Sequence, residues 1–298
     1  MNAIATEAIE SLEIIDAQIH EPKPAAPLTD EQKAHATVFE VELAREAMDS
    51  IGVDIALAVT SEAFIEVAAQ RYPGRFPGVV TFNLNSPDLA ADAARVRSSP
   101  INVAGRALVG DWKDATLRPE FTAGRFDPLF AAAERVGLPL FISTHGHCRV
   151  MSAVAERHPN LTLIIDHIGV SQHPVSPPAQ EPWKTFTDLL ELARYPNVHV
   201  KLCGAPLLSE QAYPFDDLRP WLERLFAAFG VGRIMWASDY TRMRMADLPR
   251  GRRPRRRGLS YADSLNYVLR SDWISYAEKQ ALCGGSARRI LQLPPRMD

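Results

Sequence analysis

Short apolar runs that end abruptly in a histidine or an aspartate recur along this chain, and they constrain its fold more than any other feature. The four clearest runs are Ile14–His20, Phe141–His145, Leu163–His167 and Ile234–Tyr240. Each has the length of a β-strand and is mostly apolar, as expected of a strand that is buried on both faces. In a parallel α/β barrel the carboxyl ends of the strands meet at one face, which is the face that carries the chemistry.

Eight strand and helix units follow one another, and no change of composition between them marks a linker. The expected strands are 14–20, 55–59, 79–82, 103–109, 138–143, 161–165, 197–202 and 234–240. Strands that alternate with helices predict a parallel sheet. We therefore predict an α/β fold, a single (β/α)8 TIM-type barrel domain over residues 1–298. An open doubly wound sheet is the alternative, but no glycine-rich phosphate loop follows any strand.

Local signals set several boundaries. Glu21–His35 is rich in proline and alanine and reads as a loop, with a helix from about Val38. Asp127 followed by Pro128 predicts an N-cap and a proline at the first helical position. We read residues 1–12 as an N-terminal extension and residues 241–260 as an arginine-rich loop.

The composition, 46% hydrophobic and 23% charged, is typical of a soluble domain with a sizeable core. A formal net charge of −3 is too small to indicate a polyanionic partner. The three cysteines have no ligand-like spacing, which suggests reduced thiols in a cytoplasmic protein. Met1–Leu12 lacks the features of a signal peptide, and no apolar stretch approaches the ~18 residues of a membrane span. We expect no nucleic-acid or membrane partner, and the sequence leaves a homo-oligomer open.

Four residues at the ends of predicted strands suggest a metal centre: His20, His145, His167 and Asp239. A mononuclear hydrolytic site needs a few nitrogen and oxygen ligands that leave one position open for water. Any one of these histidines alone is as readily a structural residue. Four such residues at four strand ends are a far stronger coincidence.

The strand ends resemble the amidohydrolase superfamily, specifically its amidohydrolase-2 (amidohydrolase-related) family near the 2-pyrone-4,6-dicarboxylate lactonase-like and sugar-lactone hydrolases. The motifs that carry the resemblance are Ile15–His20, His145-Gly146, Ile165–Gly169, Asn197–Gly204 and Gly232–Tyr240. In the last of these, Ala237 replaces a glycine of the family pattern. The likeness extends from Ile14 to Leu291, so it implies a barrel over nearly the whole chain.

The resemblance also implies roles. It places His20, His145 and Asp239 at metal-ligand positions and His167 at the position of a ligand or transition-state stabiliser, with Asp239 doubling as the general base. The chain departs from the family at Gln18, where a histidine or glutamate is usual, and a neutral amide is a poorer ligand for a divalent ion. We therefore expect either a zinc or manganese site of reduced affinity or a site that works without metal.

Basic and polar residues near the predicted strand ends suggest a small anionic substrate, because guanidinium groups suit carboxylates and sulfonates. The candidates for substrate binding are Gln18, Arg106, His147, His173, Arg242 and Arg244. Lys201 is a candidate catalytic residue that could polarise a carbonyl, and it could equally form a structural ion pair. Arg250–Arg257 reads mainly as a solvated segment, and it lacks the interleaved aromatic residues of a nucleic-acid site.

These observations predict a hydrolase that opens a small acidic lactone or a related cyclic ester with an activated water, metal-assisted at the C-terminal face of the barrel. Asp239 would activate the water, and a metal or the cluster of His20, His145 and His167 would polarise the carbonyl. A metal-dependent decarboxylase of an aromatic or enolic acid is the first alternative. A metal-free binding protein is the second.

Overall fold

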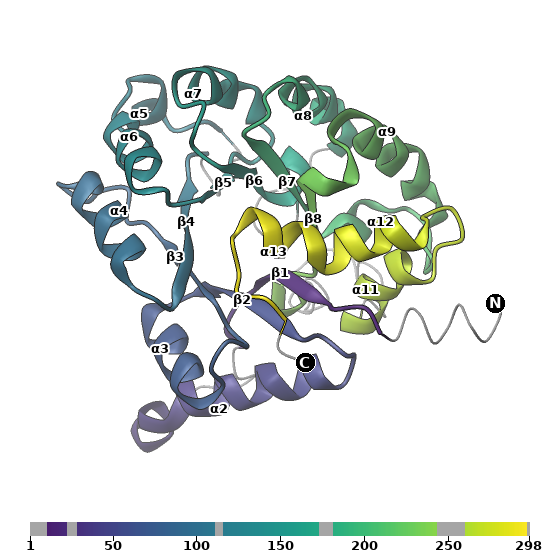
Figure 1. Cartoon of the computed structure of the whole chain (residues 1–298), viewed down its shortest axis with the longest axis horizontal. Coiled ribbons are helices and arrows are strands. Elements are labelled where there is room, and N and C mark those ends of the chain that lie inside the picture. Colours follow the sequence, from purple (N-terminus) through teal and green to yellow (C-terminus); the bar gives the residue numbers. More distant parts are fainter. Residues whose placement is uncertain (1–10, 23–28, 111–115, 173–180, 243–259, 297–298) are drawn as a thin grey trace.

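Eight parallel strands form the centre of the molecule in the order β1 to β8, and helices alternate with them around the outside (Figure 1). The computed structural model describes residues 11–22, 29–110, 116–172, 181–242 and 260–296. The strands are β1 (Ile15–Ile19), β2 (Ile55–Thr60), β3 (Gly78–Thr81), β4 (Asn102–Leu108), β5 (Leu140–Ser143), β6 (Leu163–Ile165), β7 (Val198–Cys203) and β8 (Ile234–Ala237). The predicted (β/α)8 arrangement is confirmed.

The first and last strands meet at their carboxyl ends. The backbone N–H of Asp239 donates to the carbonyl of Gln18 at 3.1 Å, and the N–H of Ser238 donates to the Asp16 carboxylate at 2.9 Å. An open doubly wound sheet would leave these two strands on separate edges. The sheet therefore curls into a nearly closed barrel.

The helices lie around the strands, and most of them bury one face against the barrel. They are α2 (Asp30–Asp49), α3 (Glu62–Arg71), α4 (Leu89–Ser98), α5 (Pro119–Thr122), α6 (Asp127–Val136), α7 (Met151–Arg157), α8 (Phe186–Glu191), α9 (Arg219–Phe229), α11 (Tyr261–Leu269), α12 (Tyr276–Gln280) and α13 (Ser286–Ile290). Within the described ranges, no helix combines the length and the apolar character needed to cross a bilayer.

Two predicted helix starts were wrong. Helix α2 begins at Asp30, inside the stretch that we expected to be loop, because Thr29 and Gln32 form a reciprocal capping box. In α6, Asp127 is the first helical residue and Phe126 precedes it without a side-chain cap. The carboxylate of Asp127 instead accepts hydrogen bonds from Arg157 at 3.1 Å. Both errors moved a boundary and left the order of the elements unchanged.

The interior of the barrel is filled from the strands and closed at one end by the C-terminal segment. Ile290 and Leu293, in and after α13, pack on the same buried cluster as the inward-facing Ile15, Phe141 and Met235. A side chain at Gly284, just before α13, would place its Cβ 2.5 Å from the carbonyl oxygen of Glu13, so only glycine allows this approach. The amino end of the barrel is thereby covered, which leaves the carboxyl ends of the strands for chemistry.

His199, near the start of β7, gives the fold a pH dependence that is independent of any active site. Its side chain is buried, and burial, with Arg289 and Arg233 nearby, lowers its pKa from 6.5 to about 4. The unfolded chain therefore binds a proton between these pH values that the folded chain does not. Stability from this residue is present above pH 6.5 and is lost as the pH falls through 4.

Acidification from pH 6.5 to 4 is expected to lower the unfolding free energy of the wild-type chain by about 3 kcal/mol more than that of a His199→Gln variant. This figure follows from ~1.4 kcal/mol per pKa unit. Denaturant unfolding of both proteins across this range measures the difference. Parallel pH curves for the two proteins would contradict the assignment.

Candidate active site

Three of the predicted site residues adopt an uncommon backbone conformation directly after their strands. His145, His167 and Asp239 have φ angles of 47°, 54° and 52°, in the left-handed region that non-glycine residues seldom occupy. Each such residue costs of the order of 1–3 kcal/mol and persists only where its surroundings impose it. Strain of this kind clusters at functional sites, and here it occurs at three strand ends on one face.

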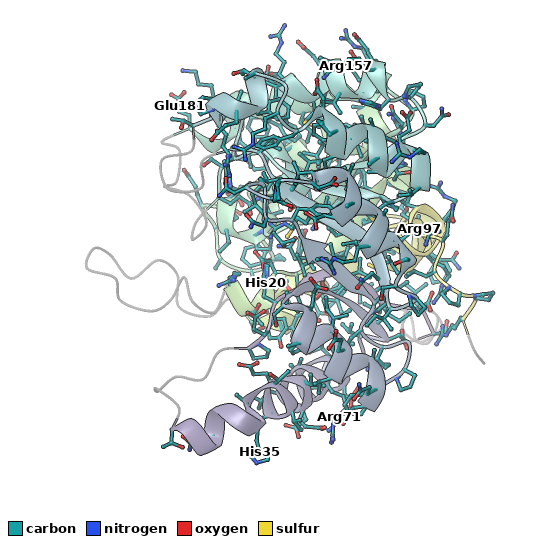
Figure 2. All side chains as sticks on the ribbon, turned by 90° about the vertical axis from the view of Figure 1, so that its left-hand side faces the viewer. His20, His35, Arg71, Arg97, Arg157 and Glu181 are labelled. Carbon is teal, nitrogen blue, oxygen red and sulfur yellow. The ribbon has the colours of Figure 1, made fainter. Side chains whose placement is uncertain are left out.

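Figure 2 shows that His20, after β1, lies at the opposite side of the barrel from Arg97, near the end of α4. Arg97 precedes β4 and so marks the amino end of the strands. His20 therefore lies at the carboxyl end, where the predicted site was expected.

The structure brings three of the four predicted ligands together. One ligand atom each of His167, Asp239 and Cys203 lie within 4.8 Å of one another, and all three residues are buried. His20 joins this group through its Nε2, which is 3.3 Å from Asp239 Oδ1. Among the described residues no such group includes His145, whose Nε2 lies 3.4 Å from Ser143 Oγ.

His20 Nε2 has two polar neighbours. The Lys201 ammonium donates to Gln18 Oε1, so the amide nitrogen of Gln18 is the end that faces His20 Nε2, at 3.3 Å. Asp239 Oδ1 lies at the same distance from this ring nitrogen. His20 thus connects Gln18 on the first strand with Asp239 after the last.

Unpartnered polar atoms converge at this point. Both ring nitrogens of His167 and Oδ1 of Asp239 are buried and have no hydrogen-bond partner among the described residues. A buried polar group left unsatisfied costs about 1–3 kcal/mol, so a ligand that engages these atoms is favoured. Imidazole and carboxylate are suitable donors for a divalent cation, and the residues present fit one.

The protonation states of the cluster suit hydrolysis near neutral pH. Burial lowers the pKa of His167 to about 4, so its ring is neutral. Burial acts to raise the pKa of Asp239, but His20, His167 and Arg106 outweigh it and hold this pKa below its usual range. Burial lowers the pKa of His20 as well, against the opposing effect of Asp239. The site thus pairs an ionised carboxylate with neutral imidazoles.

A second set of charges lies beneath the cluster. The Lys201 ammonium is 2.8 Å from Asp166 Oδ1 and 4.0 Å from the centre of the Phe141 ring, and its side chain is fully enclosed. Arg106 Nε donates to the other oxygen of Asp166 at 2.7 Å. Burial acts to raise the pKa of Asp166, and the two cations lower it well below its usual range. This is the ion pair that the sequence left open for Lys201.

Asp16 ties the first strand to the last and so fixes Asp239. Its carboxylate accepts from the backbone N–H of Gln18 at 3.0 Å, from Ser238 and from Tyr261 Oη at 2.8 Å. Burial raises its pKa to about 6, although these hydrogen bonds oppose the rise. Because Ser238 directly precedes Asp239, the network sets the position of the candidate base.

The remaining predicted substrate contacts lie at the rim or beyond the described residues. Arg242 is half-buried, its backbone N–H donates to the Asp239 carbonyl at 2.9 Å, and its charge helps to lower the pKa of His20. His147 is exposed at the start of a short 3-10 turn after β5. His173 and Arg244 fall outside the described residues, as does Arg250–Arg257.

Sequence reasoning missed Cys203 and the structural role of Asp16. The three cysteines were assessed by their spacing along the chain, and all three are free and buried as expected of reduced thiols. The available signal was position, because Cys203 is the last residue of β7. Strand ends, and not sequence spacing, bring ligands together in a barrel.

The chain resembles known proteins in sequence. The sequence model of the family described as Amidohydrolase matches residues 15–293. L-fucono-1,5-lactonase from Burkholderia ambifaria is 31% identical over 173 residues, which cover 55% of this chain and 54% of the relative. 4-Sulfomuconolactone hydrolase from Hydrogenophaga intermedia is 30% identical over 141 residues, covering 45% and 44%. The chain thus spans about half the length of the curated relatives that it matches.

Solved structures share the architecture. An amidohydrolase from Burkholderia multivorans with bound zinc has a TM-score of 0.70 at 22% identity, over 95% of this chain and 100% of that one. A putative 2-pyrone-4,6-dicarboxylic acid hydrolase from Pseudomonas putida has a TM-score of 0.66 at 19% identity, over 96% and 99%. At these identities the likeness shows the fold alone.

Proposed function

Because the chain belongs to the amidohydrolase-2 family, we propose that it is a hydrolase that opens a small acidic lactone or a related cyclic ester. The observation that carries the proposal is the buried Asp239 carboxylate, held ionised and with one unpartnered oxygen, beside the neutral ring of His167. The two curated relatives named above act on lactones, which supports this substrate class.

Asp239 is the base in this proposal. Its pKa lies below the usual range, so the carboxylate is ready to accept a proton from water at neutral pH. The strained backbone at Asp239 and the Asp16 network hold the unpartnered oxygen in place. A base that is positioned before the substrate arrives needs little reorganisation during the reaction.

His167 and His20 serve the carbonyl side. The oxygen of the attacking water forms a bond to the lactone carbonyl carbon while its proton passes to Asp239. A neutral His167 has one N–H, which can donate to the oxygen that gains charge. Collapse of the tetrahedral adduct breaks the ring C–O bond, and the proton held by Asp239 passes to the leaving ring oxygen. The product is an open-chain hydroxy acid.

A divalent ion would be held by His167 and Asp239, with His20 beside them, and would polarise the carbonyl and make water more acidic. Zinc or manganese suits these donors. His145 stays a further proposed ligand from the sequence. The charges of Arg106 and Arg242 act on the same cluster and favour an anionic substituent on the substrate. We assign Lys201 and Gln18 a positioning role, because each binds the other inside the barrel.

The test is turnover of a small panel of lactones, followed by titration of the acid released. The panel holds sugar 1,5-lactones, lactones that bear a carboxylate or sulfonate, and an unsubstituted six-membered lactone as the matched neutral control. We expect one proton released per lactone opened and a higher kcat/KM for the anionic members. Release of carbon dioxide from an aromatic or enolic acid, with no lactone opened, would favour the decarboxylase. Binding without any turnover would favour the binding protein.

A further inference from the structure

We propose that Cys203 is a thiolate ligand of the divalent ion at this site and that it makes the site select zinc over manganese. This inference rests on the site of the proposed function and adds a ligand to it. It depends on the positions of three strand ends and on the partners of the atoms around them.

Cys203 stands between the two other donors. It ends β7, while His167 follows β6 and Asp239 follows β8, so three neighbouring strands each supply one donor. Their ligand atoms lie within 4.8 Å of one another. Tetrahedral zinc with bonds of 2.0–2.3 Å holds its ligand atoms roughly 3.3–3.8 Å apart. Small side-chain movements therefore suffice to close the group around one ion.

The neighbours of Cys203 argue against a purely structural thiol. A cysteine packed in a core needs no polar surroundings, and Cys203 does contact the apolar interior of the barrel. Yet the other two members of the cluster, His167 and Asp239, are at least nine-tenths buried, and their ring nitrogens and Oδ1 have no hydrogen-bond partner in the part of the chain that the structure describes. Lone pairs of three ligand types thus converge on one enclosed point.

The first strand does not supply the missing ligand. Gln18 Oε1 accepts from Lys201, and its amide nitrogen faces His20 Nε2 at 3.3 Å. The amide oxygen is therefore engaged, and His20 Nε2 already lies 3.3 Å from both this amide nitrogen and Asp239 Oδ1. Cys203 is the remaining buried donor that reaches both His167 and Asp239 among the described residues.

Sulfur sets the choice of metal. Thiolate ligands favour zinc, whereas manganese and magnesium favour sites built from oxygen. Binding exchanges a proton for the ion, because the Cys203 S–H bond breaks, a sulfur–metal bond forms and the proton goes to solvent. The thiolate and the Asp239 carboxylate together neutralise a bound dication, so attraction for an anionic substrate comes from the nearby charges of Arg106 and Arg242.

The experiment uses the full-length protein, freed of metal and titrated with Co²⁺ alone or Zn²⁺ alone. We expect the cobalt protein to show a near-ultraviolet sulfur-to-cobalt charge-transfer band that is lost in Cys203→Ser and kept in Cys148→Ser, a matched buried thiol. We also expect Cys203→Ser to bind Zn²⁺ roughly 100-fold more weakly, since structural zinc sites divide their binding energy among about four ligands.

Zinc X-ray absorption of the wild-type protein gives a result that does not depend on whether a variant folds. A sulfur neighbour at about 2.3 Å from zinc would support the proposal. A shell of nitrogen and oxygen only, a charge-transfer band that persists in Cys203→Ser, or no binding of either ion would overturn it. Lactone opening by a protein that fails these tests would leave the proposed function standing. A sulfur–metal bond in a protein that opens no lactone would leave this inference standing.

Discussion

An Asp239→Asn variant is expected to lose roughly 100- to 10,000-fold in kcat for lactone opening, the range that a positioned general base contributes. The carboxylate is buried, ionised and strained into place, and asparagine has nearly the same shape but cannot accept the proton of water. Substrate contacts made by the rest of the pocket remain, so we expect KM to change far less than kcat.

Steady-state kinetics on the lactone of the panel that turns over best measure kcat and KM separately. Asp92→Asn, a change of the same kind on the outer helix α4, is the matched control and should leave both constants unaltered. An Asp239→Asn protein that is folded and keeps most of its kcat would remove Asp239 from the reaction. A large rise in KM at constant kcat would assign it to substrate binding instead.

A Lys201→Met variant is expected to lower the unfolding free energy by about 3–5 kcal/mol, as is typical when one partner of a buried ion pair is removed. Methionine fills much of the lysine volume but offers no charge. Among the described residues Asp166 would keep Arg106 as its one paired cation, and Gln18 Oε1 would lose the Lys201 donor. Both buried polar groups would then be poorly satisfied.

Denaturant unfolding of Lys201→Met, Asp166→Asn and the double variant forms a complete cycle. We expect the double variant to be more stable than the sum of the two single losses predicts, because each single variant already breaks the same contact between Lys201 and Asp166. Arg149→Met, which breaks two long ion pairs of an exposed side chain, is the surface control and should cost less than about 1 kcal/mol. Additive losses in the cycle would mean that Lys201 and Asp166 do not depend on each other.

The barrel could be predicted because two features of its strands are visible in the sequence. The strands are apolar over most of their length, and several of them end in a histidine or an aspartate. Helix starts were harder, because α2 is set by a reciprocal cap between Thr29 and Gln32 that lies in a proline-rich stretch. Asp127 resembled a cap in sequence, but its carboxylate is bound by Arg157 from another helix, 30 residues away in sequence.

The site was partly visible in the sequence. His20, His167 and Asp239 end strands and do lie together, whereas His145 lies apart from the group that His167, Asp239 and Cys203 form. The left-handed backbone of His145, His167 and Asp239 could not be foreseen, because none of these positions holds glycine, the residue that adopts this conformation most readily. Sequence spacing also cannot show that neighbouring strands bring Cys203 to the same point.

The role of Gln18 in the site could not be predicted from the sequence. From sequence it was a substitution at an expected ligand position and a candidate substrate contact. In the structure it bridges Lys201 and His20, because its oxygen accepts from the Lys201 ammonium and its amide nitrogen lies 3.3 Å from His20 Nε2. Such a role depends on a lysine 183 residues away in the chain, and only the closed barrel brings the two together.

Isotope analysis of the product is the most direct test of the central claim that water activated by Asp239 adds to a lactone carbonyl. The lactone that turns over best is converted in water enriched in oxygen-18, and the open-chain acid is examined by mass spectrometry. One heavy oxygen in the new carboxylate, with no carbon dioxide formed, is the result that the proposed mechanism requires. Heavy oxygen in the new hydroxyl group, or carbon dioxide as a product, would contradict it.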